Sequence, residues 1–232
     1  MKREPRLLCV STAREPRGAV LVLHGGASRR TDMGVSPTQL SVIRMVPIAR
    51  RVARAGAGTL QVFRLLNSYR GWESGHTPVK DVRWALARIP EQLGRSVPVC
   101  LIGHSLGGRA ALLTAGEPSV AAAVALAPWV LPGDVPRGLH GTPLLIVHGA
   151  QDRIASPDRP AALAARLQGR AEVEFVLVPG AGHAMLRHHD AFSRRAARFA
   201  TRTLLGGPAA EDPPGAPTRA ARASRPSSSR VS

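Results

Sequence analysis

The chain has 232 residues, 44% of them hydrophobic, which is enough for one α/β domain with a full core. Its formal net charge is +17, but the basic residues are spread along the chain and only one tyrosine accompanies them, so the charge does not indicate a specific nucleic-acid site. The sequence contains neither a run of about 18 apolar residues nor a signal-peptide core, and we therefore expect a cytoplasmic protein without a membrane span.

Apolar runs alternate with helical patterns along the chain. This alternation predicts a mostly parallel sheet with helices on both faces. Pro47 lies inside the first helical pattern, so we expect that helix to be kinked or split. Strands are predicted at 7–11, 19–24, 59–66, 97–102, 120–127, 143–148 and 173–178, and helices at 38–55, 78–93, 106–115, 157–167 and 187–205.

The composition changes at residue 206 to Pro, Ala, Ser and Arg, with almost no large apolar side chains beyond it. Such a segment buries too little apolar surface to offset the conformational entropy that it would lose on ordering. The sequence therefore predicts two parts, an α/β catalytic domain at 1–205 and a disordered tail at 206–232.

A serine follows the predicted strand 97–102 within the stretch Gly103-His104-Ser105-Leu106-Gly107. A strand, Gly-x-Ser-x-Gly and a helix in this order are typical of a nucleophile elbow, a tight turn that exposes the serine hydroxyl. Glycines flank such a serine because side chains there would clash with the neighbouring strand and helix. Ser105 is therefore the candidate nucleophile.

A serine nucleophile needs a base that takes its proton and a carboxylate that orients the base. Asp152 follows the predicted strand 143–148, and His183 lies in the glycine-rich loop after the strand 173–178. The order Ser105, Asp152, His183 matches the triad order of α/β hydrolases. Asp134 is the second choice for the acid, and Asp158 is interpreted as a helix cap.

Backbone N–H groups are expected to stabilise the oxyanion that forms on the attacked carbonyl. One should come from Leu106, the residue after the nucleophile. For the other, the glycine-rich turn after the strand 19–24 offers Gly26 as first choice and Ala27 as second. The alternative for this turn is a plain connection between a strand and a helix.

Two tryptophans follow predicted strand ends, at the edge where α/β sheets place their sites. Trp129 is a candidate wall of the acyl pocket and Trp72 a candidate opposite wall, and the alternative for both is core or loop packing. Arg64, Arg70 and Arg109 lie near the same edge, where an arginine can bind a substrate carboxylate with two hydrogen bonds. For each arginine the alternative is a structural or solvated role.

The other histidines are expected to be structural. His104 lies within the elbow and should point away from the nucleophile, while His24 and His148 should hydrogen-bond loops at strand ends. The run 188–190 resembles a metal cluster only in composition, because no further ligand spacing supports zinc. We interpret it as the solvated start of the last helix.

Residues 7–205 resemble the α/β-hydrolase superfamily through the stretches VLHGG, IGHSLGGRAAL, ALAPW, IVHGAQDRI and PGAGHAML. These are similar to small lidless serine hydrolases of the dienelactone-hydrolase or carboxylesterase kind from high-GC actinobacteria. The resemblance implies a three-layer αβα fold, the triad named above, and Gly26 and Leu106 as oxyanion donors. Residues 130–141 are too short and too rich in Pro and Gly for the cap domain of many members. The best-studied dienelactone hydrolases use cysteine where this chain has Ser105.

The function expected from these features is hydrolysis of a small-molecule carboxylic ester, thioester or lactone through an acyl-enzyme, without a metal or organic cofactor. One alternative is a prolyl-oligopeptidase-like peptidase, a group that usually carries a gating domain. Another is a non-catalytic binding protein on a hydrolase fold. The sequence specifies neither the acyl and alcohol groups nor the oligomeric state.

Overall fold

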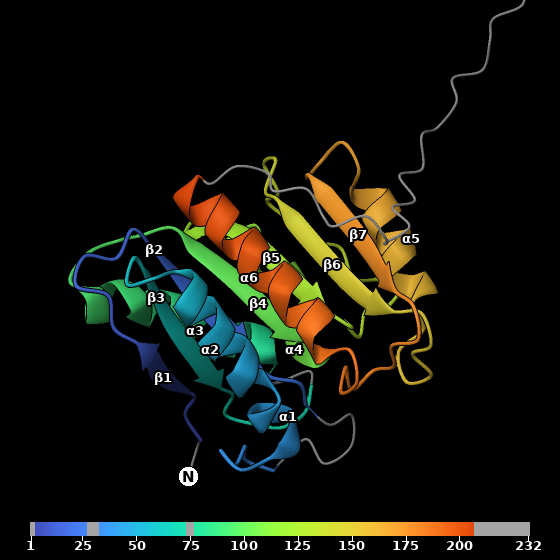
Figure 1. The fold of residues 1–232 in the computed structure, drawn as a ribbon, viewed down its shortest axis with the longest axis horizontal. Coiled ribbons are helices and arrows are strands. Elements are labelled where there is room, and N and C mark those ends of the chain that lie inside the picture. Colours follow the sequence, from blue (N-terminus) through green and yellow to red (C-terminus); the bar gives the residue numbers. More distant parts are fainter. Residues whose placement is uncertain (1–2, 27–32, 73–76, 207–232) are drawn as a thin grey trace, which may run out of the picture.

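The central element of the computed structural model is a seven-stranded sheet (Figure 1). The structure describes residues 3–26, 33–72 and 77–206. The strand order is β1-β3-β2-β4-β5-β6-β7, in which β1 pairs with β3 in antiparallel fashion and all other pairs are parallel. The strands are β1 Arg6–Ser11, β2 Gly18–Leu23, β3 Leu60–Leu66, β4 Val99–His104, β5 Val120–Leu126, β6 Leu144–Gly149 and β7 Val173–Val178.

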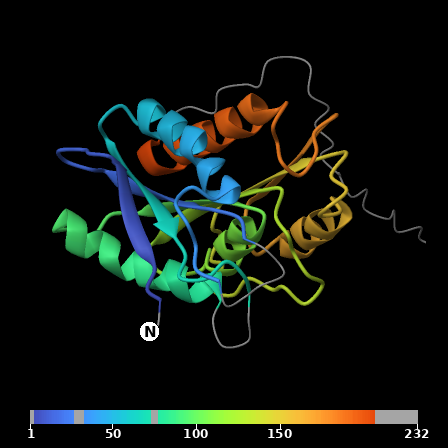
Figure 2. The ribbon, with the colours of Figure 1, turned by 90° about the horizontal axis from the view of Figure 1, so that it is seen from below.

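Helices cover both faces of the sheet and complete a three-layer αβα arrangement (Figure 2). Successive side chains of a strand point to opposite faces, so Leu21 and Leu23 of β2 pack in one core cluster and Val20 and Val22 in the other. The first cluster is completed by α3, α4 and α5, and the second by α2 and α6. The helices are α1 Leu40–Ile43, α2 Met45–Ala55, α3 Pro78–Leu93, α4 Leu106–Leu113, α5 Asp158–Leu167 and α6 His189–Leu205.

The predicted elements are confirmed, with boundaries that move by at most two residues. The expected break in the first helix occurs at Arg44, between α1 and α2 and three residues before Pro47. Pro47 has no N–H to donate to the carbonyl of Ile43, and its ring crowds that carbonyl. The chain passes from α1 to α2 through the single residue Arg44, whose φ of −54° and ψ of −31° remain helical.

The six parallel strands all end at one edge, where the loops that carry the predicted site residues meet. Residues 127–143, which connect β5 to β6 and are all described, form neither helix nor strand. The connection between β5 and β6 therefore supplies no cap domain over this edge. Apart from Gly206, the predicted tail lies outside the described residues.

In the described ranges, no helix has both the length and the apolar character required to cross a membrane.

Packing of α6 on the sheet gives a prediction about stability. Phe192 is fully buried in the cluster that α2 and α6 share, so Phe192→Ala should lower the free energy of unfolding by about 3–5 kcal/mol. Leu186 is 75% exposed, and Leu186→Ala should cost less than about 0.5 kcal/mol. Urea unfolding of both variants measures the difference, and equal losses would contradict this account of the core.

Candidate active site

Ser105 occupies a strained turn between β4 and α4. Its backbone has φ 55° and ψ −118°, a conformation that residues with a side chain rarely adopt. The turn is tight because Gly103 lies against the start of α4: a Cβ on Gly103 would be 2.1 Å from the carbonyl oxygen of Gly107. A Cβ on Gly107 would be 2.5 Å from the carbonyl oxygen of His24, after β2. The predicted role of the two glycines is confirmed.

The structure brings Ser105, His183 and Asp152 into one hydrogen-bonded chain. Nε2 of His183 lies 3.0 Å from Oγ of Ser105, and Nδ1 of His183 lies 2.8 Å from Oδ2 of Asp152. The carboxylate can only accept, so Nδ1–H donates to it and Nε2 is free to accept the serine proton. Loops after β4, β6 and β7 supply the three side chains, although Ser105 and His183 are 78 residues apart.

Asp152 is buried and held as an anion. Its Oδ1 accepts hydrogen bonds from the backbone N–H groups of Ile154 and Ala155, both at 2.9 Å. Burial alone raises the pKa of Asp152, but hydrogen bonds from His148, His183 and the Ala155 N–H lower it more, and the pKa lies well below its ordinary value. The charged form can therefore orient His183 throughout the neutral pH range.

The candidate oxyanion donors flank the nucleophile. Gly26 and Leu106 both line the cavity that contains Ser105, and Leu106 opens α4. A Cβ on Gly26 would be 2.9 Å from Cδ1 of Leu106 and 2.1 Å from the carbonyl oxygen of Arg70, so only glycine permits this approach. Ala27, the second choice, lies outside the described residues.

Ser105 opens into a cavity of about 470 Å³. Trp72 and Trp129 both line it, as predicted. Three other lining residues, Ser41, Arg44 and Ile154, could not be predicted from the sequence, because no local pattern places α1 and the β6–α5 loop beside the serine. The lining residues are Gly25, Gly26, Ser41, Arg44, Trp72, His104, Ser105, Leu106, Arg109, Trp129, Ile154 and His183.

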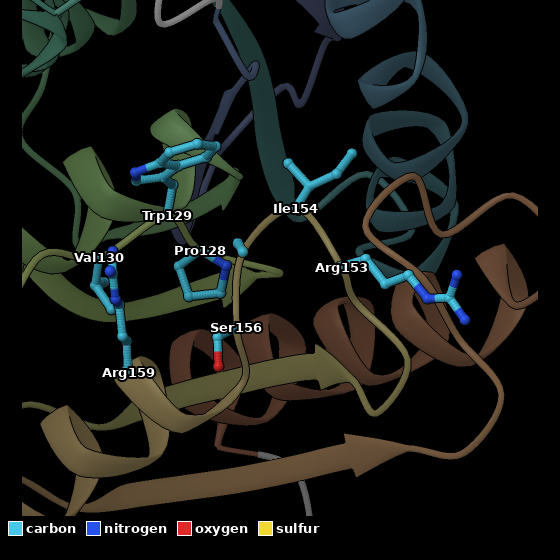
Figure 3. A pocket seen from close by; sticks show the side chains of 8 residues that line it. Pro128, Trp129, Val130, Arg153, Ile154, Ser156 and Arg159 are labelled. Carbon is cyan, nitrogen blue, oxygen red and sulfur yellow. The ribbon is translucent and has the colours of Figure 1, made fainter.

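A second hollow of about 310 Å³ adjoins the first (Figure 3). Trp129 and Ile154 line both, so these two side chains form the ridge between them. In Figure 3, Arg159 reaches from α5 toward Val130, whereas the guanidinium of Arg153 points away from Trp129. The second hollow therefore extends the catalytic cavity toward α5 without containing a member of the triad.

Asp134, the second choice for the acid, is engaged elsewhere. Its carboxylate forms two hydrogen bonds with Arg109, at 2.8 and 2.7 Å, and the Arg109 guanidinium lies 3.9 Å from the ring centre of Trp72. The expectation that Asp134 is in reserve for the triad is wrong, because this pair braces the Trp72 wall. Of the three arginines named from the sequence, Arg109 lines the cavity, and Arg64 and Arg70 are not among its described lining residues.

Arg44 is the basic group that the sequence analysis missed. It is half-buried in the cavity wall, burial lowers its pKa from the ordinary value, and it has no acidic partner within the described part of the chain. None of the described lining residues is acidic. Because Asp134 already neutralises Arg109, the guanidinium of Arg44 gives the described lining residues a positive charge that none of them balances.

The structural roles expected for the strand-end histidines are confirmed. His24 donates from Nδ1 to the carbonyl of Gly25 and accepts from the backbone N–H of Asn67. His148 lies 2.8 Å from the carbonyl oxygen of Ala155. His104 also has the expected structural role, because it is buried and its Nε2–H donates to the carbonyl of His183 at 2.9 Å, although the residue is among those that line the cavity.

Two expectations for helix starts have different outcomes. Asp158 is not the cap of α5 but its first residue, and it accepts a hydrogen bond from Oγ of Ser156 at 3.0 Å. At the start of α6, Asp190 pairs with Arg51 and Arg194. Among the residues with described positions, no group of three or more His, Cys, Asp or Glu side chains could hold a metal ion.

Comparison with known proteins gives a family and a set of structures with the same fold. Residues 63–204 match the profile of the dienelactone hydrolase family. A search of curated protein sequences found no match.

The similar structures include an α/β serine hydrolase without a lid from Xanthomonas campestris, with a TM-score of 0.65, 18% identity, and coverage of 88% of this chain and 90% of that one. Est1E from Butyrivibrio proteoclasticus with ferulic acid bound has a TM-score of 0.61, 15% identity, and coverage of 86% and 95%. A thermophilic esterase from Thermogutta terrifontis with butyrate bound has a TM-score of 0.63, 17% identity, and coverage of 87% and 89%. At these identities the likeness shows a shared α/β serine hydrolase fold.

The environment of His104 predicts how stability depends on pH. Burial lowers the pKa of His104 to about 3, against 6.5 in the unfolded chain. Below pH 6.5 the unfolded state gains a proton that the folded state does not accept until about pH 3. The free energy of unfolding should therefore decrease as the pH is lowered from 6.5 to about 3, by roughly 1.4 kcal/mol per pH unit for this group. Urea unfolding at pH 6, 5 and 4 should show a shallower fall in His104→Gln, and parallel curves would contradict the assignment.

Proposed function

The chain belongs to the dienelactone hydrolase family, and from this premise we propose that it is a serine hydrolase that cleaves carboxylic esters through Ser105, His183 and Asp152. The observation that carries the proposal is the unbroken chain of hydrogen bonds from Ser105 Oγ to His183 at 3.0 Å and from His183 to Asp152 at 2.8 Å. The Ser105 end of this hydrogen-bonded chain lies in the wall of a cavity that is open to a small substrate.

The chain's own groups can perform each step of this reaction. Nε2 of His183 takes the proton as Ser105 Oγ attacks the ester carbonyl, and Asp152 stabilises the resulting imidazolium. The backbone N–H groups of Leu106 and Gly26 are the donors proposed for the oxyanion. His183 then protonates the departing alcohol, and a water activated by His183 hydrolyses the acyl-enzyme to release the acid.

The cavity favours a small ester that carries a negative charge. The flat rings of Trp72 and Trp129 suit a planar or short acyl group, and the similar structures with ferulic acid and butyrate hold acids of that size. Arg44 supplies a positive charge that the described lining residues do not neutralise, and a guanidinium binds a carboxylate with two hydrogen bonds. A monoester of a small dicarboxylic acid meets both conditions.

The nucleophile can be tested without knowledge of the substrate. A fluorophosphonate probe should label Ser105 in the wild type, because its reaction needs an activated hydroxyl and an oxyanion site. Mass spectrometry should locate the adduct on Ser105, and labelling should be lost in Ser105→Ala and His183→Ala. Both variants should unfold like the wild type. Ester hydrolysis by Ser105→Ala at the wild-type rate would refute the assignment, and a folded wild type without label would favour the non-catalytic alternative.

The charge preference can be tested with two substrates of similar size, 4-nitrophenyl butyrate and 4-nitrophenyl hydrogen succinate. Arg44→Met should lower the ratio of kcat/KM for the charged over the neutral ester by about tenfold, since it removes a charged hydrogen-bond donor. Arg50 is an exposed arginine of α2 that does not line the cavity, and Arg50→Met should leave the ratio unchanged. A ratio that is the same in Arg44→Met and the wild type would exclude Arg44 as the selector.

A further inference from the structure

Asp152 has a second histidine partner that the triad does not use. We propose that His148 is a positioning residue of the active site, which donates a hydrogen bond to Oδ2 of Asp152 and so fixes the carboxylate that orients His183. The catalytic consequence of this inference rests on the proposed function, but the hydrogen bond itself does not.

The geometry places one N–H group of His148 between two acceptors. His148 lies at the end of β6 and its side chain is fully buried. Its Nε2 is 2.8 Å from the carbonyl oxygen of Ala155 and 3.1 Å from Oδ2 of Asp152. A carbonyl oxygen only accepts, so Nε2 must carry a hydrogen, and Oδ2 of Asp152 lies within hydrogen-bond distance of the same nitrogen.

The other ring nitrogen shows that His148 is neutral. Its Nδ1 is buried and has no hydrogen-bond partner among the described residues. A proton on Nδ1 would leave a buried donor unpaired in addition to burying a charge, and both are costly. The ring therefore keeps the single hydrogen on Nε2, which is the form that can donate to Asp152.

His148 completes the set of donors around the carboxylate. Oδ1 of Asp152 accepts from the N–H groups of Ile154 and Ala155, and Oδ2 accepts from His183 and His148. Ala155 closes a ring of contacts, because its N–H donates to Asp152 while its carbonyl accepts from His148. With two donors on each oxygen, the carboxylate cannot rotate without breaking several hydrogen bonds.

His148 acts through Asp152 and not on the substrate. It is 0% exposed and is not among the lining residues of either hollow. The other titratable or charged groups that face this part of the site are His104, whose ring centre lies 5.1 Å from that of His183, and Arg44, which acts on His104 at longer range. Neither donates to Asp152, so the second hydrogen bond on Oδ2 belongs to His148 alone among the described residues.

Two substitutions of His148 distinguish the effect of its N–H donor from the effect of the volume that its ring fills. His148→Phe fills the buried space but removes the donor, whereas His148→Gln places an amide N–H at the level of Nε2. Thr114→Val is the control, because it removes a different buried side-chain hydrogen bond, from Thr114 Oγ1 to the carbonyl of Ala110. All three are compared with the full-length wild type.

The first measurement needs no substrate. The ¹³C resonance of the Asp152 carboxyl group in the free enzyme at pH 7 reports on the hydrogen bonds that it accepts, and it should shift clearly more in His148→Phe than in His148→Gln or Thr114→Val. An unchanged resonance in His148→Phe, or an equal shift in His148→Gln, would overturn the inference. In the wild type at pH 7, ¹⁵N NMR should show the ring hydrogen of His148 on Nε2, and an Nδ1–H form would overturn the inference even if His148→Phe fails to fold.

The second measurement concerns catalysis. In His148→Phe, kcat for 4-nitrophenyl butyrate should fall about 10- to 100-fold with KM within about twofold, and His148→Gln should recover most of this loss. A wild-type kcat in His148→Phe would overturn the positioning role. If the wild type hydrolyses no ester at all, the proposed function fails, while the ¹³C resonance of Asp152 still decides whether His148 holds the carboxylate.

Discussion

The active site depends on two close approaches of backbone to backbone. Ser105 can hold its positive φ only because α4 begins directly against β4, and this contact leaves no room for a Cβ on Gly103 or Gly107. The same contact fixes the position of Leu106 N–H and Gly26 relative to the serine hydroxyl. The cost of the strained residue, of order 1–3 kcal/mol, is borne by buried strands on both sides of β4.

The site residues that lie just after the carboxyl ends of strands could be predicted from the sequence. Parallel strands must bring their carboxyl ends to one edge, so Ser105, Asp152 and His183 had to meet once their strands were recognised. Trp72 and Trp129 were found by the same reasoning. The break before Pro47 could also be predicted, because it follows from a property of the residue itself.

The remaining features depend on contacts that no local pattern encodes. Arg44 lies in the cavity wall at the junction of α1 and α2, a position that no pattern around residue 44 indicates. Asp134 was misjudged because its partner, Arg109, lies 25 residues earlier on α4. The bond from His148 to Asp152 spans four residues, but it forms only because the turn after β6 folds the carboxylate back over the strand end.

Trp129 is attached to the nucleophile through the backbone. Its N–H donates to the carbonyl of Ser105 at 3.2 Å, and the same carbonyl accepts from the N–H of Arg109, which stacks on Trp72. Both aromatic walls are thus tied to the residue that attacks the substrate. The backbone hydrogen bonds therefore hold the distance from the Ser105 hydroxyl to each tryptophan wall constant. Exchange of the side chains at positions 72 and 129 can therefore change which acyl group is accepted without moving Ser105, His183 or Asp152.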